Sequence, residues 1–138
     1  MGKLLRQGAL LVTFLWFMSG GIAHFTHTSF FVSLLPGEAL WMREAILVSG
    51  AVEILLALML LSARVRPLAG WGLIAVTLTV LPVNSWMWLN PEQYPDIAPW
   101  ILDLRLLIQL LLPGIIWWGT RRVAVPTATR HAGIARSR

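Results

Sequence analysis

The chain has 138 residues, of which 57% are hydrophobic and only 12% are charged, and its formal net charge is +5. That charged share is about half that of an ordinary soluble domain, and a soluble protein of this size could not bury so much apolar surface. The composition excludes a soluble enzyme, a disordered regulator and a fibrous repeat, and it predicts an integral membrane protein. The sequence contains no cysteine, which excludes disulfides, thiol exchange, iron–sulfur clusters and covalent haem attachment.

Four apolar segments are long enough for helices that cross a bilayer, because about 20 apolar residues span ~30 Å of hydrocarbon. They cover about residues 4–23, 41–61, 67–89 and 100–118. The segments lack strand alternation and are too long for barrel strands. Short links favour antiparallel neighbours, so we expect an all-α, up-down-up-down four-helix bundle at residues 1–122.

Three further segments of the chain lie between the spans or at its ends. The link at residues 26–40 is long and apolar, and we expect a short amphipathic or re-entrant segment at the membrane interface. Residues 123–138 are basic and rich in Ala and Thr, which predicts a disordered cytoplasmic tail. The basic residues at the start of the chain, followed by an apolar segment and Gly21-Ile22-Ala23, also fit a cleavable signal peptide. Because this sequence includes the segment from Met1, we expect it to be retained as the first span.

The basic residues predict the orientation. Nine of the 11 fall on one side of the four-span arrangement: Lys3, Arg6, Arg64, Arg66, Arg121, Arg122, Arg130, Arg136 and Arg138. All six acidic residues fall on the other side or inside the spans. The positive-inside rule therefore predicts that both termini are cytoplasmic. We expect a multi-pass protein of the inner (plasma) membrane. Charges that lie between and beyond apolar segments favour anionic lipids over nucleic acid as counter-ions.

Several landmarks occur in a characteristic order: Gly21-Ile22-Ala23-His24-Phe25, Phe30-Phe31 with Pro36, Val48-Ser49-Gly50-Ala51-Val52-Glu53-Ile54, Arg66-Pro67-Leu68-Ala69-Gly70-Trp71, Asn84, Asn90-Pro91-Glu92-Gln93-Tyr94-Pro95-Asp96 and Leu104-Arg105-Leu106-Leu107-Ile108-Gln109. In this order, over roughly residues 8–120, the chain resembles the DoxX-like family of small four-helix membrane proteins. The resemblance implies a four-helix bundle and an association with redox and quinone-linked membrane complexes. Some redox relatives use cysteines, so thiol chemistry of that kind is not open to this chain.

Polar residues inside the predicted spans are the candidates for function, because a charge in the bilayer costs at least ~2.5–3.5 kcal/mol. Helix geometry places five of them near the midplane or in the outer half of the bundle: His24, Glu53, Asn84, Arg105 and Gln109. The Cα atoms of Glu53 and Arg105 differ in depth by ~10 Å, which argues against a direct pair. Gln109 matches the depth of Glu53 better, so we expect a protonated Glu53 to bond to Gln109 or Asn84.

These residues support two functions. The favoured one is a non-catalytic accessory or scaffold subunit of a redox-linked membrane complex, whose polar residues fix the helix register. The alternative is a quinone- or lipid-binding oxidoreductase subunit, with a polar pocket for a head group and an apolar tail. Whether the chain is an enzyme stays open. A channel is disfavoured because the inner half of every span is almost purely apolar.

The partners we expect are the lipid bilayer and either other subunits of a membrane complex or further copies of the chain, with quinone as the candidate ligand and no nucleic acid. His24 and His27 could present two imidazoles on one helical face, with Glu44 as a third group. A metal site needs three or four ligands, and thiolates are missing, so we expect hydrogen bonding rather than metal binding.

Overall fold

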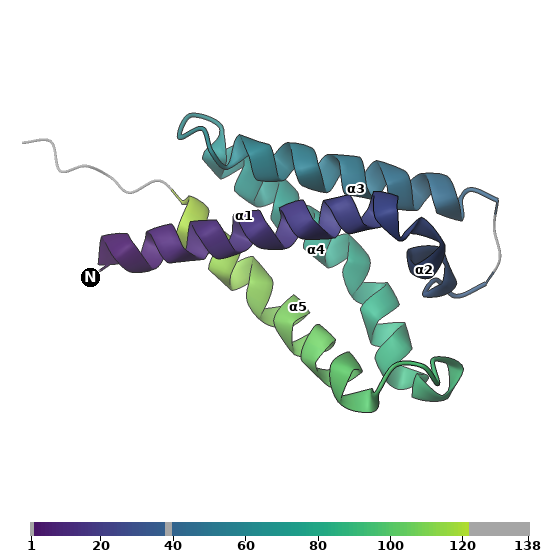
Figure 1. Ribbon diagram of the computed structural model, residues 1–138. Helices are drawn as coiled ribbons and strands as arrows, with labels where there is room; N and C mark the ends of the chain where they lie inside the picture. The colour runs from purple at the N-terminus through teal and green to yellow at the C-terminus, as the bar shows by residue number, and fades with distance from the viewer. Residues whose placement is uncertain (1, 38–39, 122–138) are drawn as a thin grey trace, which may run out of the picture.

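The computed structural model describes residues 2–37 and 40–121. These residues form α1 (Gly2–Thr26), α2 (Thr28–Ser33), α3 (Met42–Met59), α4 (Arg66–Leu89), the short 3-10 helix η1 (Pro91–Gln93) and α5 (Pro99–Thr120), as Figure 1 shows. No strand occurs in this part of the chain, which confirms the all-α prediction. The predicted tail at residues 123–138 lies outside the described residues.

Proline and glycine mark the helix boundaries. Pro67 and Pro99 stand in the first turns of α4 and α5, where the fixed φ of proline suits a helix and its missing N–H costs no hydrogen bond. Gly37 has a φ of 88°, a conformation that favours glycine, and it turns the chain between α2 and α3. Pro82 and Pro113 lie inside α4 and α5, where each removes one backbone hydrogen bond and favours a bend.

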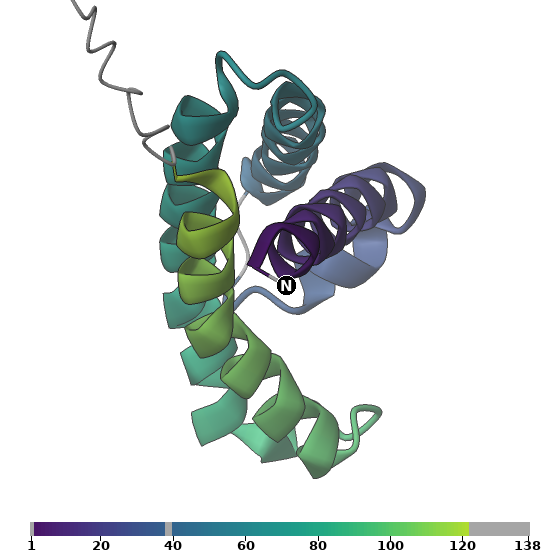
Figure 2. The same ribbon diagram turned by 90° about the vertical axis from the view of Figure 1, so that its left-hand side faces the viewer.

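The long helices form two antiparallel pairs. α1 packs mainly against α3, and α4 packs mainly against α5. The two pairs meet at the end where the chain starts and separate toward the other end, and the second pair is inclined to the first (Figures 1 and 2). A hydrophobic core joins the pairs where they meet, and its buried residues are Phe17, Ala57, Leu60, Ala69, Leu73, Leu112 and Ile116.

A second, smaller core closes the opposite end. It contains the buried residues Leu34, Met87, Tyr94 and Leu102. The Tyr94 hydroxyl donates a hydrogen bond to the backbone oxygen of Leu34 over 3.0 Å. The segment after α2 is thereby attached to the loop between α4 and α5, which links the two helix pairs at the end where the long helices lie apart.

Glycine allows α1 and α3 to approach closely. A Cβ atom on Gly50 would lie 2.7 Å from the Cβ atom of His24 and 2.8 Å from the backbone oxygen of Gly21. The same Gly21, given a Cβ atom, would meet the Ile54 side chain at 2.7 Å. These helices therefore pack backbone against backbone, as small residues permit in membrane helices.

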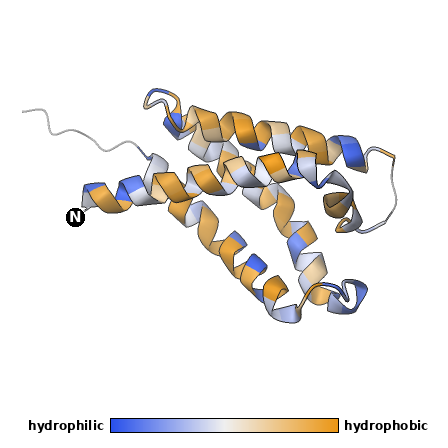
Figure 3. Cartoon of the chain, viewed as in Figure 1, coloured by the Kyte–Doolittle hydropathy of each residue, from blue (hydrophilic) through white to orange (hydrophobic). Residues whose placement is uncertain are grey.

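Three helices in the described residues are long and apolar enough to cross a membrane: α1, α4 and α5. They match the predicted spans 4–23, 67–89 and 100–118. Apolar residues cover most of the long helices, and hydrophilic residues gather at helix ends, in loops and at a few points within α4 and α5 (Figure 3). This pattern is compatible with a membrane protein.

The predicted span 41–61 corresponds to α3, which is not among those three helices. Its 18 residues include Arg43, Glu44 and Glu53. Three charges in one helix of this length make it less apolar than α1, α4 and α5, and the crossing of the membrane by α3 stays a prediction.

Candidate functional site

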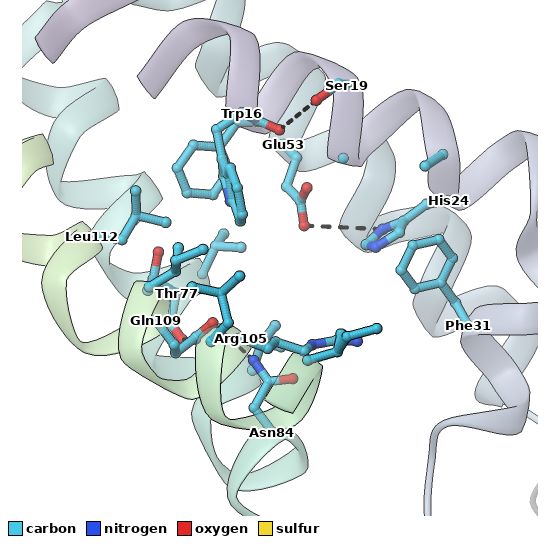
Figure 4. Close-up of a pocket in the computed structure, with 18 of the residues that line it drawn as sticks. Trp16, Ser19, His24, Phe31, Glu53, Thr77, Asn84, Arg105, Gln109 and Leu112 are labelled. Carbon is cyan, nitrogen blue, oxygen red and sulfur yellow. Dashed lines mark hydrogen bonds and ion pairs between the residues drawn. The ribbon is translucent and has the colours of Figure 1, made fainter. Parts of the chain in front are cut away.

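A cavity of about 610 Å³ lies between the α1–α3 pair and the α4–α5 pair (Figure 4). The structure brings all five of the polar residues singled out from the sequence to its walls: His24, Glu53, Asn84, Arg105 and Gln109. The other lining residues are mostly apolar and aromatic, including Trp16, Phe17, Phe31, Val80 and Leu112. The result is a mainly apolar chamber with two polar walls that face each other.

The wall on α1 and α3 carries an acid and an imidazole. Glu53 Oε1 accepts a hydrogen bond from Ser49 Oγ over 3.3 Å and lies 3.9 Å from His24 Nδ1. The side chains of His24 and Glu53 are only 12% and 9% exposed. His24 Nδ1 is buried and has no hydrogen-bond partner in the described part of the chain. An unpaired buried nitrogen is costly, so a polar partner for this atom would stabilise the wall.

Neighbouring residues hold that wall in place. A Cβ atom on Gly20 would lie 3.2 Å from Glu53 Oε2, so glycine at this position leaves room for the carboxyl group. The ring of Phe31 in α2 packs edge-on against the imidazole of His24, with 4.3 Å between the ring centroids. Both contacts limit the rotamers open to the acid and the imidazole, which organises the wall before any ligand binds.

The wall on α4 and α5 carries an amide network and a cation. Asn84 Nδ2 donates to Gln109 Oε1 over 2.8 Å, and Gln109 Nε2 donates to the backbone oxygen of Thr77. Asn84 is 4% exposed, and its Oδ1 has no partner among the described residues. Arg105 is half-buried at the same wall, and no acidic side chain of residues 2–37 or 40–121 forms an ion pair with it.

The expected bond from Glu53 to Gln109 or Asn84 is wrong. The two amides bond to each other, and Glu53 bonds to Ser49 one turn away on its own helix. The reason is that the two helix pairs separate at this depth, which leaves the cavity between the acid and the amides. The argument against a Glu53–Arg105 pair agrees with the described residues, where no such ion pair occurs.

Sequence reasoning missed part of the lining. Thr77 contributes its backbone oxygen, and it lies seven residues before Asn84, two turns along the same face of α4. Trp16, Ser19 and Gly20 precede His24 by one to two turns of α1 in the same way. Helical spacing from the recognised polar residues would have indicated these positions.

The second histidine does not join the cavity. His27 is exposed and lies 2.8 Å from the Thr26 hydroxyl through its Nδ1 atom. Within residues 2–37 and 40–121, no group of three His, Cys, Asp or Glu side chains is arranged to hold a metal ion. The spacing of His24 and His27 therefore does not bring two imidazoles to one site.

The cavity opens sideways between α1 and α5. These helices touch near Gly119, where an added Cβ atom would lie 3.5 Å from Ala9, and they diverge beyond that point (Figure 1). The lining residues that are also exposed at the surface belong to α1, α2 and α5: Trp16, Ser19, Phe30, Ile101 and Leu104. A mouth with such an apolar rim suits entry from a lipid environment rather than from water.

Comparison with known proteins places the chain in a family. A family model described as Domain of unknown function (DUF8561) matches residues 12–123. The chain belongs to the DUF8561 family. The DUF8561 match covers all five polar residues of the cavity and both of its walls. No curated protein and no solved structure matches this DUF8561 member, and its resemblance to the DoxX-like family stays a prediction.

Proposed function

We propose that this protein binds a lipid-soluble molecule with an oxygen-bearing head, of the quinone or quinol class, inside the membrane. The observation that carries the proposal is the cavity of about 610 Å³ with hydrogen-bonding groups on two opposite walls. Its volume falls in the range of ligand pockets, which are mostly apolar with a few placed polar groups. A ring with oxygens at opposite edges could bond to both walls at once.

The two walls offer complementary chemistry. On one side, the imidazole of His24 and the carboxyl group of Glu53 can donate or accept a proton in a hydrogen bond. On the other side, Arg105 offers only donors, while the Oδ1 atom of Asn84 is an acceptor without a partner. A quinone carbonyl suits the donors, and a quinol hydroxyl suits the acceptors. An isoprenoid-like tail would leave through the apolar mouth between α1 and α5.

The state of the polar groups favours ligand binding over a purely structural role. A scaffold held together by polar contacts would have a dry cluster with every group bonded, since buried polar atoms are nearly always satisfied. Here two buried polar atoms, His24 Nδ1 and Asn84 Oδ1, lack partners in the described residues, and the residues that carry them line a roomy cavity. Binding of this kind is compatible with an accessory subunit of a redox-linked membrane complex, which the DoxX-like resemblance implies.

The proposal includes a topology of four membrane crossings, with both termini in the cytoplasm and the cavity in the outer half of an inner-membrane protein. α3 has 18 residues, or about 27 Å of helix, close to the hydrocarbon thickness of ~30 Å. Arg43 and Glu44 stand in its first turn, at the depth of the interface, and Glu53 faces the cavity rather than lipid. The basic residues at the opposite end support the orientation.

The test uses purified protein in nanodiscs and a benzoquinone with a ten-carbon tail as the probe. Because Trp16 lines the cavity, saturable quenching of tryptophan fluorescence reports binding. We expect Glu53→Gln and Arg105→Gln to weaken binding about ten-fold each, as for the loss of one charged hydrogen bond. Glu44→Gln and Arg43→Gln make the same changes outside the cavity and should have no effect.

Two results would overturn the proposal. One is quenching that rises linearly with quinone, which would indicate partition into lipid rather than a site. The other is an equal effect of the cavity variants and their matched controls. Stable co-purification with other membrane subunits, together with either result, would restore the scaffold interpretation.

A further inference from the structure

A second hollow lies at the basic end of the molecule, between the beginning of α4 and the end of α5. These two helix ends lie side by side in Figure 2. The hollow measures about 190 Å³ and is lined by Pro67, Trp71, Ile74, Trp117, Thr120 and Arg121, a set that we call the α4–α5 groove. It is at the opposite end of both helices from Asn84 and Arg105, so it is separate from the cavity described above.

The walls of the α4–α5 groove are fixed by close helix packing. A Cβ atom on Gly70 would overlap the side chain of Thr120, so α4 and α5 are in direct contact beside the groove. The rings of Trp71 and Trp117 are 63% and 48% exposed and form its apolar sides. Trp71 is five residues into α4, about 7.5 Å from the helix start, a depth typical of tryptophan at a membrane interface.

A cation stands at the mouth of the α4–α5 groove. The guanidinium carbon of Arg121 lies 4.8 Å from the ring centre of Trp117, in a cation–π arrangement. A second guanidinium is held at the same end of α5, because Arg6 Nε donates to the backbone oxygen of Gly119 over 3.0 Å. Stacking leaves the edge of the Arg121 guanidinium and its donors open to an acceptor.

The charges around the α4–α5 groove are all of one sign. Lys3, Arg6, Arg64 and Arg66 belong to the same end of the molecule as Arg121. The described acidic residues lie in α3, in the loop between α4 and α5, and in the first two turns of α5, away from this end. Residues 122–138 contain no Asp or Glu in the sequence. Among the described residues, no acidic side chain lies at this end to pair with Arg121, which leaves its guanidinium open to an anion from outside the protein.

We propose that the α4–α5 groove binds one acidic phospholipid. Its phosphate would bond to Arg121, because a planar guanidinium matches the oxygens of a phosphate. One acyl chain would lie along Trp71, Ile74 and Trp117, whose apolar surfaces line the groove at interface depth. The occupant follows from charge complementarity, since a cationic mouth above an apolar floor fits an anionic head above a chain.

The test measures phospholipid binding to the full chain in mild detergent by native mass spectrometry. The probes are phosphatidylglycerol and phosphatidylcholine with the same acyl chains. We expect the unaltered protein to prefer phosphatidylglycerol, and Arg121→Gln to weaken that binding about ten-fold, as for the loss of one hydrogen bond between charged groups. Trp117→Leu should weaken it too, through loss of one groove wall.

The matched control is Arg64→Gln, which removes one exposed charge from the same end but outside the α4–α5 groove. It should change phosphatidylglycerol binding less than about two-fold. An equal effect of Arg64→Gln and Arg121→Gln would overturn the proposal, because it would indicate diffuse attraction to the whole basic end. Equal affinity for phosphatidylcholine would overturn it as well. Thermal melting of each variant checks that the fold is kept, and none of these substitutions touches the quinone cavity.

Discussion

Replacement of Gly50 by alanine adds one methyl group at the point where α1 and α3 are closest. The new Cβ atom would lie 2.7 Å from the Cβ atom of His24 and 2.8 Å from the backbone oxygen of Gly21. Carbon atoms in ordinary contact are about 3.5–4.0 Å apart, so α1 and α3 must separate by roughly 0.8 Å. Neither obstacle is the end of a flexible side chain, so the helices themselves must move.

The added methyl group of Gly50→Ala overpacks the contact between α1 and α3, and overpacking lowers the free energy of unfolding by about 1–3 kcal/mol in a close-packed interior. The gain in helix propensity from Gly to Ala, about 0.8–1 kcal/mol, works in the opposite direction and reduces the net loss. Gly114→Ala is the matched control, because a Cβ atom there would meet nothing within 4 Å. This control should keep or raise stability, since it gains propensity without a clash.

The assay is reversible unfolding in mixed micelles, followed by circular dichroism, with quinone binding measured on the same samples. Gly50→Ala should lose stability and also weaken quinone binding, because His24 and Glu53 project from the two helices that separate. If Gly50→Ala were as stable as Gly114→Ala, the backbone contact between α1 and α3 would not exist as described. A loss of stability without any change in binding would refute the link between this contact and the cavity wall.

Other substitutions test the two cores and the amide network by the same unfolding assay. Gln109→Leu should lower the free energy of unfolding by about 1–3 kcal/mol, because Asn84 and the Thr77 backbone oxygen each lose a hydrogen-bond partner. The same change at exposed Gln93 should have no measurable effect on stability. Leu73→Ala should lower the free energy of unfolding by about 2–5 kcal/mol, since this side chain is fully buried. Equal stability of Gln109→Leu and Gln93→Leu would contradict the amide network, and an unchanged stability of Leu73→Ala would contradict the packing of the first core. Tyr94→Phe should lower the free energy of unfolding by about 0.5–1.5 kcal/mol through loss of its bond to Leu34, and an unchanged stability would show that this bond does not hold the second core together.

Much of the fold could be predicted because hydrophobic length is a local property. The segments at residues 67–89 and 100–118 agree with α4 and α5 to within two residues, since flanking Pro67 and Pro99 restrict where a helix begins. The segment at 4–23 is shorter than α1, which begins at Gly2 and continues to Thr26 past the polar side chain of His24. Length and composition could not decide whether α3 crosses the membrane, because Glu53 is polar but faces inward.

The candidate site, like the fold, could be predicted from the sequence only in part. Depth follows from a rise of 1.5 Å per residue, so the sequence could indicate that His24, Glu53, Asn84, Arg105 and Gln109 occupy one half of the bundle. Which of them bond to each other depends on rotation about each helix axis and on the angle between the helix pairs. Those are decided by side-chain packing, which a single sequence does not reveal, and the expected partner of Glu53 was wrong for that reason.

The orientation of α3 is the central claim, because the outer cavity and the inner α4–α5 groove both depend on it. The sequence has no cysteine, so single cysteines can be introduced without background at Ser33, before α3, and at Ser62, after it. A membrane-impermeant maleimide applied to intact spheroplasts should label Ser33→Cys at once and Ser62→Cys only after permeabilisation. Labelling of both positions from the same side would contradict a fourth membrane crossing, and with it the placement of Glu53 inside the bilayer.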